Sequence, residues 1–217
     1  MKKLIERIKD NKILLSLVVL IIGAFAILVF RATYAYFVGQ ITETPGDITV
    51  KTGTPSKFEF DVGDSLTINA TSTTLPENGS NLETTTTASA MLLANSVDNH
   101  STMNYYVYFR VNENNFGYSD GSTPEIILII TDPNGNEVTS LDGLTYGTFS
   151  GVSGFDVTTT TGLFEVANNY EIVSNSSKVA TTQNWQFKLT YLNLDVDQSA
   201  NYGHVMDTNV VMSKERK

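Results

Sequence analysis

Apolar and polar positions alternate with a period of two in many segments after residue 56. Segments 57–62 and 66–70 each place apolar residues at every second position, and segment 105–111 does the same with aromatic and β-branched residues. Segments 185–191 and 206–212 repeat the pattern near the C-terminus. Successive side chains of a strand point to opposite faces of its sheet, so each segment predicts a strand with one buried face.

Further strands are predicted by other signals. The continuous apolar run 126–130 is typical of a strand buried on both faces, and the Asn134-Gly135 pair after it indicates a hairpin turn. Gly63-Asp64 predicts a turn or a corner of a sandwich, and 88–94 is an apolar run that fits either a strand or a helix. Weaker strands are expected near 144–149, 155–158, 162–166 and 170–174.

Threonine-rich stretches interrupt this pattern. Residues 71–87 are polar and show no periodicity, which predicts a long surface loop or flexible linker, or alternatively an insertion that faces a ligand or partner. The runs Thr84–Thr87 and Thr158–Thr161 are interpreted as exposed strand or loop, because threonine tolerates both a pleated strand and solvent.

The number and spacing of these strands define the fold class. Eight to ten short strands separated by turns predict an all-β protein, a jelly-roll or Ig-like antiparallel sandwich, preceded by one N-terminal apolar helix. We expect a single β-sandwich domain over residues 46–217.

The N-terminal segment carries a membrane signal. Residues 1–12 form a basic flank, and residues 13–30 contain no charged side chain. As a helix, this stretch is about 27 Å long, close to the thickness of a hydrocarbon core. The basic flank favours the cytoplasmic side, so a single-span precursor with its N-terminus inside and the rest of the chain outside is expected. The predicted location is extracellular or at the cell surface.

Two fates of this helix remain open. Its length favours a permanent anchor, whereas Thr33 and Ala35 are small residues at the −3 and −1 positions of a cleavage after Ala35. In both cases residues 31–45 form the processing site and linker. The first 35 residues hold six basic and two acidic side chains, so the remainder has a formal charge of −13 in place of −9.

Composition excludes several classes of function. The chain of 217 residues has no cysteine, which excludes a disulfide scaffold, a zinc ribbon and a thiol nucleophile. Its acidic balance argues against a nucleic-acid partner. The two histidines, His100 and His204, are over a hundred residues apart and are interpreted as separate surface or core residues. Because no catalytic motif is present either, we expect no enzyme activity, no cofactor and no metal.

One loop has oxygen-bearing side chains at alternating positions, namely Asp195, Asp197, Ser199 and Asn201. This spacing resembles a calcium loop, but an EF-hand would have glycine where Ala200 stands. A solvated hairpin loop is the preferred interpretation, with calcium binding as the alternative.

Several short motifs resemble those of one family. Thr33-Tyr34-Ala35-Tyr36-Phe37 follows the apolar span in a TxAxF pattern, and 46–50 is a short segment that begins with glycine. The Gly-Asp corner within 62–68 and the Asp-, Gln- and Asn-rich loop 193–203 complete the set. At both ends, though not over 71–180, the chain resembles the TasA/camelysin family of exported Firmicute surface and matrix proteins.

The resemblance implies a signal peptidase as partner, a jelly-roll-like sandwich, and assembly into extracellular matrix fibres. Family members assemble partly by lending an N-terminal strand to the next subunit. Here that strand would contain Tyr36, Phe37, Val38 and Ile41, although the same stretch could simply be a linker. Camelysin has been classed as a metalloprotease, but the sequence offers no HExxH motif or clustered ligand set.

The leading hypothesis is therefore an exported structural protein of the surface or extracellular matrix that self-associates, with itself as main partner. A membrane-anchored extracellular binding (adhesion) module is the alternative. A metallopeptidase, which rests on the family label alone, is third.

Overall fold

The structure is a computed structural model that describes residues 42–44, 47–49, 53–74 and 79–217. It divides the chain into two compact units, Met1–Gly53 and Thr54–Lys217. In the first unit, β1 (Thr42–Thr44) pairs antiparallel with β2 (Asp47–Thr49). The predicted apolar helix 13–30 lies outside the described residues. Within the described ranges, no helix is long and apolar enough to cross a membrane.

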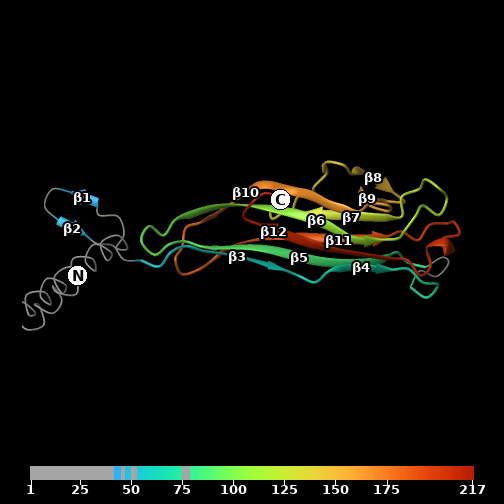
Figure 1. The fold of residues 1–217 in the computed structure, drawn as a ribbon, viewed down its shortest axis with the longest axis horizontal. Coiled ribbons are helices and arrows are strands. Elements are labelled where there is room, and N and C mark those ends of the chain that lie inside the picture. Colours follow the sequence, from blue (N-terminus) through green and yellow to red (C-terminus); the bar gives the residue numbers. More distant parts are fainter. Residues whose placement is uncertain (1–41, 45–46, 50–52, 75–78) are drawn as a thin grey trace, which may run out of the picture. The chain divides into compact units, whose positions relative to one another are not determined.

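The second unit is a sandwich of two antiparallel sheets whose strands run along its long axis (Figure 1). The sandwich confirms the all-β class predicted by the alternating pattern. The four-stranded sheet has the order β10 (Gly162–Ser174), β6 (Ser101–Asn114), β12 (Val205–Ser213) and β4 (Leu66–Asn69). The six-stranded sheet has the order β3 (Lys57–Val62), β5 (Leu82–Leu93), β11 (Thr181–Tyr191), β7 (Ile126–Thr131), β9 (Val152–Asp156) and β8 (Thr145–Phe149).

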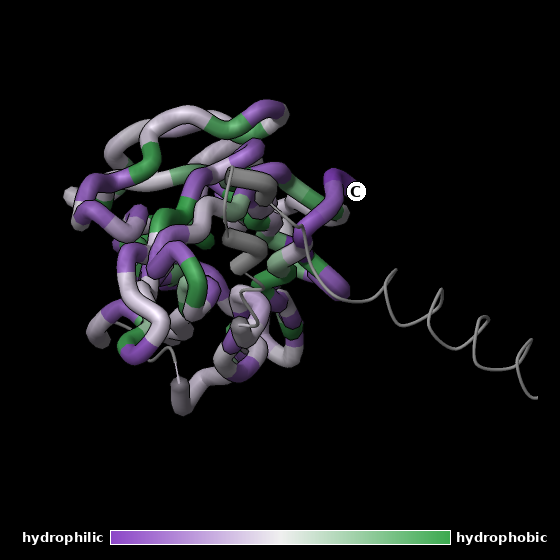
Figure 2. The backbone as a smooth tube through the Cα atoms, turned by 90° about the vertical axis from the view of Figure 1, so that its left-hand side faces the viewer, coloured by the Kyte–Doolittle hydropathy of each residue, from purple (hydrophilic) through white to green (hydrophobic). Residues whose placement is uncertain are grey.

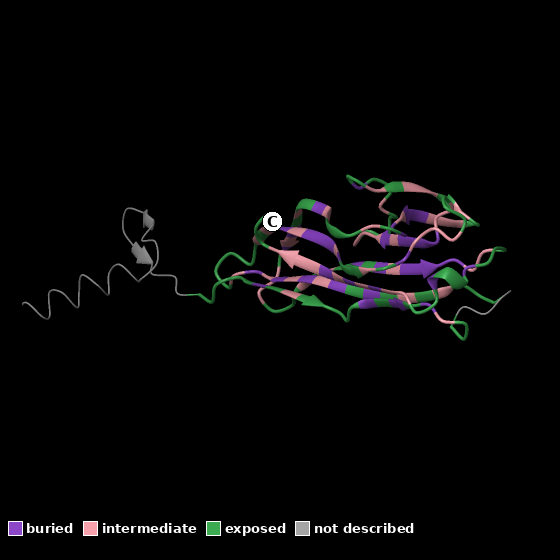
Figure 3. Cartoon of the chain, turned by 45° about the vertical axis from the view of Figure 1, so that its right-hand side comes forward, coloured by how far each residue is buried: buried purple, intermediate pink, exposed green. Residues whose placement is uncertain are grey.

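The alternating side chains form the core between the sheets. Hydrophobic and hydrophilic positions succeed one another along the chain in Figure 2, and buried positions alternate with exposed ones along the strands in Figure 3. On β6, Tyr105, Val107 and Phe109 are fully buried, and on β12 the buried positions include Met206 and Val210. The predicted inner faces of both strands are therefore confirmed.

An aromatic cluster fills one end of the core. Trp185 Nε1 donates a hydrogen bond to Tyr105 Oη at 3.0 Å, and Tyr105 Oη donates to Gln183 Oε1 at 2.8 Å. The ring of Tyr170 lies 5.1 Å from that of Trp185. Burial raises the pKa of Tyr105 to about 12, so this phenol stays protonated at neutral pH and acts as a donor.

The predicted loop over 71–87 is wrong from residue 82 onward. β5 begins at Leu82, and every residue from Leu82 to Leu92 pairs with β11. The threonine run 84–87 is therefore strand, with Thr86 only 8% exposed on the inner face. A run of identical residues has no hydropathy contrast between its two faces, so the period of two is invisible in it. The apolar run 88–94, which fitted either strand or helix, is strand to Leu93.

Two further boundaries differ from the expected ones. The segments 162–166 and 170–174 are one strand, β10, which is interrupted by an irregular register between Glu165 and Tyr170. The strand expected over 155–158 ends at Asp156, because Thr158 turns inward. Its hydroxyl accepts hydrogen bonds from the backbone N–H groups of residues 125 and 126.

Gly63 forms the predicted corner, at which the chain leaves the six-stranded sheet and enters the four-stranded one. Its N–H donates to the carbonyl of Thr87 at 2.9 Å. A Cβ atom at this position would lie 2.6 Å from the Thr86 hydroxyl and 2.9 Å from the Thr87 carbonyl oxygen. The corner therefore requires a residue without a side chain.

Gly63→Ala is accordingly expected to destabilise the sandwich by about 1–3 kcal/mol, the usual cost of overpacking. Thermal unfolding followed by circular dichroism measures this loss. Gly117→Ala is the matched control, because a Cβ there meets no atom within 4 Å. An equal melting temperature for the two variants would show that the corner tolerates a side chain.

Candidate functional site

The change of sheet at Gly63 leaves half of one edge open in each sheet. β3 pairs only with Ala88–Leu93 of β5, and β4 pairs only with Val205–Thr208 of β12. Leu82–Thr87 of β5 and Asn209–Ser213 of β12 therefore have no partner strand on that side among the described residues. Unpaired backbone N–H and C=O groups at such edges can pair with another chain.

The segment Asn209–Ser213, hereafter the β12 half-edge, is the least protected of these edges. Its sequence, Asn-Val-Val-Met-Ser, has no charge and no proline. The open half of β5 contains Glu83, which is ion-paired with Lys188 at 2.9 Å. A third open stretch, Thr181–Trp185 of β11, is shielded by Gln183, whose amide donates to the carbonyl of Glu171 on β10 at 3.0 Å.

The remaining edges carry the devices that natural sheets use against unwanted pairing. The outer face of β3 presents Lys57, Glu59 and Asp61, and the first two are ion-paired at 2.8 Å. β4 and β8 are short, with four and five residues. β10 has the irregular register described above, with Asn169 in a left-handed conformation at φ 53°. The β12 half-edge is as short as β8, but it contains no charged side chain, and its register with β6 is regular.

An apolar seam borders the β12 half-edge. It consists of Phe58, Phe60 and Val62 on the inner face of β3, together with Met212 of β12. Val62 remains 37% exposed although it points inward, because β3 is the edge of its sheet. Lys214, directly after β12, places Nζ 5.2 Å from the centre of the Phe58 ring and so links the two edges. The combination of free backbone groups and partly exposed apolar side chains suits the addition of a strand.

The structure does not test the residues that the sequence analysis assigned to processing and strand donation. All of them fall outside the described residues: Thr33, Tyr34, Ala35, Tyr36 and Phe37 for processing, and Tyr36, Phe37, Val38 and Ile41 for donation. The β12 half-edge itself was missed by sequence reasoning. An alternating pattern identifies the buried face of a strand but not its neighbours in the sheet.

The loop with alternating oxygen-bearing residues is not simply solvated, which corrects the preferred interpretation. Asn201 is 2% exposed, and its Oδ1 accepts a hydrogen bond from the backbone N–H of Gly117 at 3.1 Å. Asp197 instead accepts from Ser199, whose hydroxyl and then backbone N–H lower the pKa of the Asp197 carboxyl. Because Asn201 points into the protein, it does not share a ligand set with the exposed Asp195 and Asp197.

Asn201 belongs to a buried network around Glu125, a fully buried carboxylate that sequence reasoning also missed. Glu125 Oε1 accepts from the backbone N–H of Ser119 at 2.5 Å. Its Oε2 accepts from Tyr191 Oη at 2.9 Å, Gln198 Nε2 at 2.9 Å and Asn201 Nδ2 at 3.0 Å. Burial, and then the neighbouring carboxylate, raise the pKa of Tyr191. The network joins three segments at one end of the sandwich, and we interpret it as a structural brace.

The two histidines lie apart, as expected. His100 lies in the loop before β6, and its Nδ1 is 2.7 Å from Asn175 Oδ1. His204 directly precedes β12 and packs edge-on against Phe116. β6 and β12 are antiparallel, so their first residues are at opposite ends of the sandwich. Among the described residues, no group of three or more His, Cys, Asp or Glu side chains could hold a metal ion.

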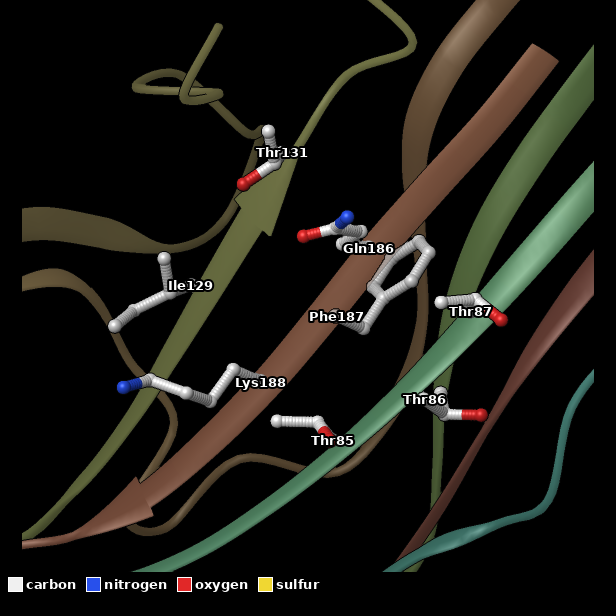
Figure 4. A pocket seen from close by; sticks show the side chains of 8 residues that line it. All are labelled: Thr85, Thr86, Thr87, Ile129, Thr131, Gln186, Phe187 and Lys188. Atoms are coloured by element: carbon white, nitrogen blue, oxygen red, sulfur yellow. The ribbon is translucent and has the colours of Figure 1, made fainter. Parts of the chain in front are cut away.

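A second surface feature is a hollow of about 410 Å³ over β5, β11 and β7 of the six-stranded sheet (Figure 4). Most of its lining points away from the core. The lining residues are Thr85, Thr86, Thr87, Ile129, Thr131, Gln186, Phe187 and Lys188. The hollow is open to solvent. Its side chains carry hydroxyl, amide and ammonium groups, but most of its exposed lining surface is apolar.

Comparisons with known proteins add no assignment to these features. No family model and no curated protein matches the chain.

Proposed function

We propose that this chain is an exported structural protein of the cell surface or extracellular matrix that self-associates by strand addition. One copy would supply an extended segment, and the β12 half-edge of the next copy would accept it. The observation that carries the proposal is the uncharged, unpaired half-edge beside a partly exposed apolar seam. A further uncharged stretch, Ser101–Tyr105 of β6, also has no strand partner on its β12 side among the described residues.

Strand addition would satisfy both parts of this surface. Main-chain hydrogen bonds to the half-edge supply affinity, and every second side chain of the incoming strand packs on the seam and fixes its register. The segment Tyr36–Ile41 has a length of six residues, against five in the half-edge, and it contains four apolar or aromatic side chains. It is therefore the proposed donor, in line with the resemblance to the TasA/camelysin family.

Export is part of the same proposal. The apolar span 13–30 with its basic flank would direct the chain across the membrane, and the Thr33–Phe37 pattern would be cut by a signal peptidase. Cleavage after Ala35 would place Tyr36 at the new N-terminus. Intact mass of the native protein tests this step, because a mass that includes residues 1–35 would mean a retained anchor.

The assembly test compares two proteins, one beginning at Tyr36 and one at Thr54, where the compact unit begins. We expect concentration-dependent fibres from the first and a monomer from the second, measured by sedimentation velocity and electron microscopy. A synthetic peptide of residues 36–41 should bind the shorter protein, and the same peptide with Val38→Pro should not. If the longer protein stays monomeric at high concentration, strand donation is wrong.

The alternative is a membrane-anchored binding module. The hollow over β5, β11 and β7 favours it, since a depression on a sheet face that combines apolar surface with a few polar groups can hold a ligand. If the native protein retains residues 1–35 and the protein beginning at Tyr36 stays monomeric, a membrane-anchored binding module explains the data better than assembly does.

A further inference from the structure

We propose that the hollow over β5, β11 and β7 binds a linear, neutral oligosaccharide that lies across the strands. This inference goes beyond self-association, because the hollow lies on the outer face of the six-stranded sheet and uses no residue of the β12 half-edge. It therefore concerns a second partner, a polysaccharide.

The first support is a row of polar side chains without a hydrogen-bond partner in the described part of the chain. Thr87, Gln186 and Thr131 stand side by side on three adjacent strands, as their register shows. None of these side chains makes a hydrogen bond within the described residues. Hydroxyl and amide groups both donate and accept, which is the capacity required to bind sugar hydroxyls.

The second support is spacing. Neighbouring strands are about 4.8 Å apart, which is close to the length of one pyranose ring in an extended chain. A glycan that crosses the strands at right angles therefore meets one hydrogen-bonding group per ring. The next row, Thr85, Lys188 and Ile129, adds a hydroxyl, an ammonium group and an apolar contact for the C–H face of a ring.

The third support is charge, which favours a neutral ligand. Lys188 is the only charged residue of the lining, and its ammonium group lies 2.9 Å from Glu83 Oε1. The hollow is therefore close to electrically neutral, while the chain as a whole carries a formal charge of −9. An anionic glycan would be repelled by the protein and would find no free cation in the lining.

The hollow is also formed in advance of binding. Its residues lie on hydrogen-bonded strands and not on loops, so a ligand does not have to order a loop. On one side β9 folds against β7 so closely that a Cβ at Gly154 would lie 2.6 Å from Ile127 Cγ2. The close approach of the Gly154 backbone to β7 restrains β7, which is one of the three strands under the hollow.

The experiment is a titration of the Thr54–Lys217 unit, which contains the whole described core, with maltohexaose, cellohexaose and chitohexaose. We expect at least one of them to cause saturable NMR shifts of the Gln186 side-chain amide and of the Thr87 and Thr131 backbone amides. Gln186→Ala should weaken that binding about tenfold, a change of about 1.4 kcal/mol.

Asn184→Ala is the matched control. Asn184 lies on the same outer face two residues away, but its Oδ1 already accepts a hydrogen bond from Ser89 Oγ at 2.7 Å. Asn184→Ala should therefore leave the affinity for the oligosaccharide unchanged. The proposal is overturned if none of the three hexasaccharides causes saturable shifts, if Gln186→Ala binds as well as the parent, or if only an anionic hexagalacturonate binds. Because the unit lacks the proposed donor segment, these outcomes are independent of assembly.

Discussion

Glu125→Ala is expected to lower the free energy of unfolding of the sandwich by about 3–5 kcal/mol. The carboxylate accepts four hydrogen bonds, and its side chain is completely buried. Alanine would leave the hydroxyl of Tyr191 and the amides of Gln198 and Asn201 without this acceptor in a cavity that the carboxylate had filled. The two amides keep the carbonyls of Leu192 and Gly117 as acceptors, so the main cost falls on the Tyr191 hydroxyl and the Ser119 N–H. Each unsatisfied buried donor costs about 1–3 kcal/mol, and the cavity adds to this.

Urea denaturation followed by circular dichroism measures this loss. Glu113→Ala is the matched control, because Glu113 is an exposed carboxylate near the same end of the sandwich and surface changes cost about 0.5 kcal/mol or less. Tyr191→Phe removes one hydrogen-bond donor to Glu125, so its urea midpoint should lie between those of the other two variants. If Glu125→Ala unfolds at the same urea concentration as Glu113→Ala, the network does not brace the loops.

The strands were predictable wherever hydropathy differs between the two faces of a strand. β3, β6, β11 and β12 have apolar residues at every second position, and the structure confirms their inner faces. The first half of β5 was not predictable, because four successive threonines give both faces the same polarity. Only its complete pairing with β11 shows that this segment is strand, and pairing between distant segments is not a property of the local sequence.

The buried network was hidden for a related reason. Its donors Tyr191, Gln198 and Asn201 are 66, 73 and 76 residues from Glu125 in the sequence, and two of them stand in a predominantly polar loop. A polar loop and a polar core cluster have the same composition. The β12 half-edge is similarly invisible, since it exists only because β3 and β4 each cover half of a longer strand.

In a protein that begins at Tyr36, Met212→Lys is expected to raise the concentration needed for assembly at least about tenfold. Met212 lies on the inner face of the β12 half-edge, half-buried against the core, and belongs to the seam that a donated strand would cover. An inward-pointing lysine on an edge strand is a device by which natural sheets prevent edge-to-edge pairing, because strand addition would bury its charge without a partner.

Met91→Lys is the matched control for this prediction. Met91 is also half-exposed, but it lies on the outer face of β5, where β3 and β11 already occupy both sides of the strand. It introduces the same charge at a position that no added strand would cover. Urea denaturation of both variants separates a loss of assembly from a loss of folding. If both variants are folded and assemble at the same concentration, the acceptor is not the β12 half-edge, and the open halves of β5 and β11 become the surfaces to test.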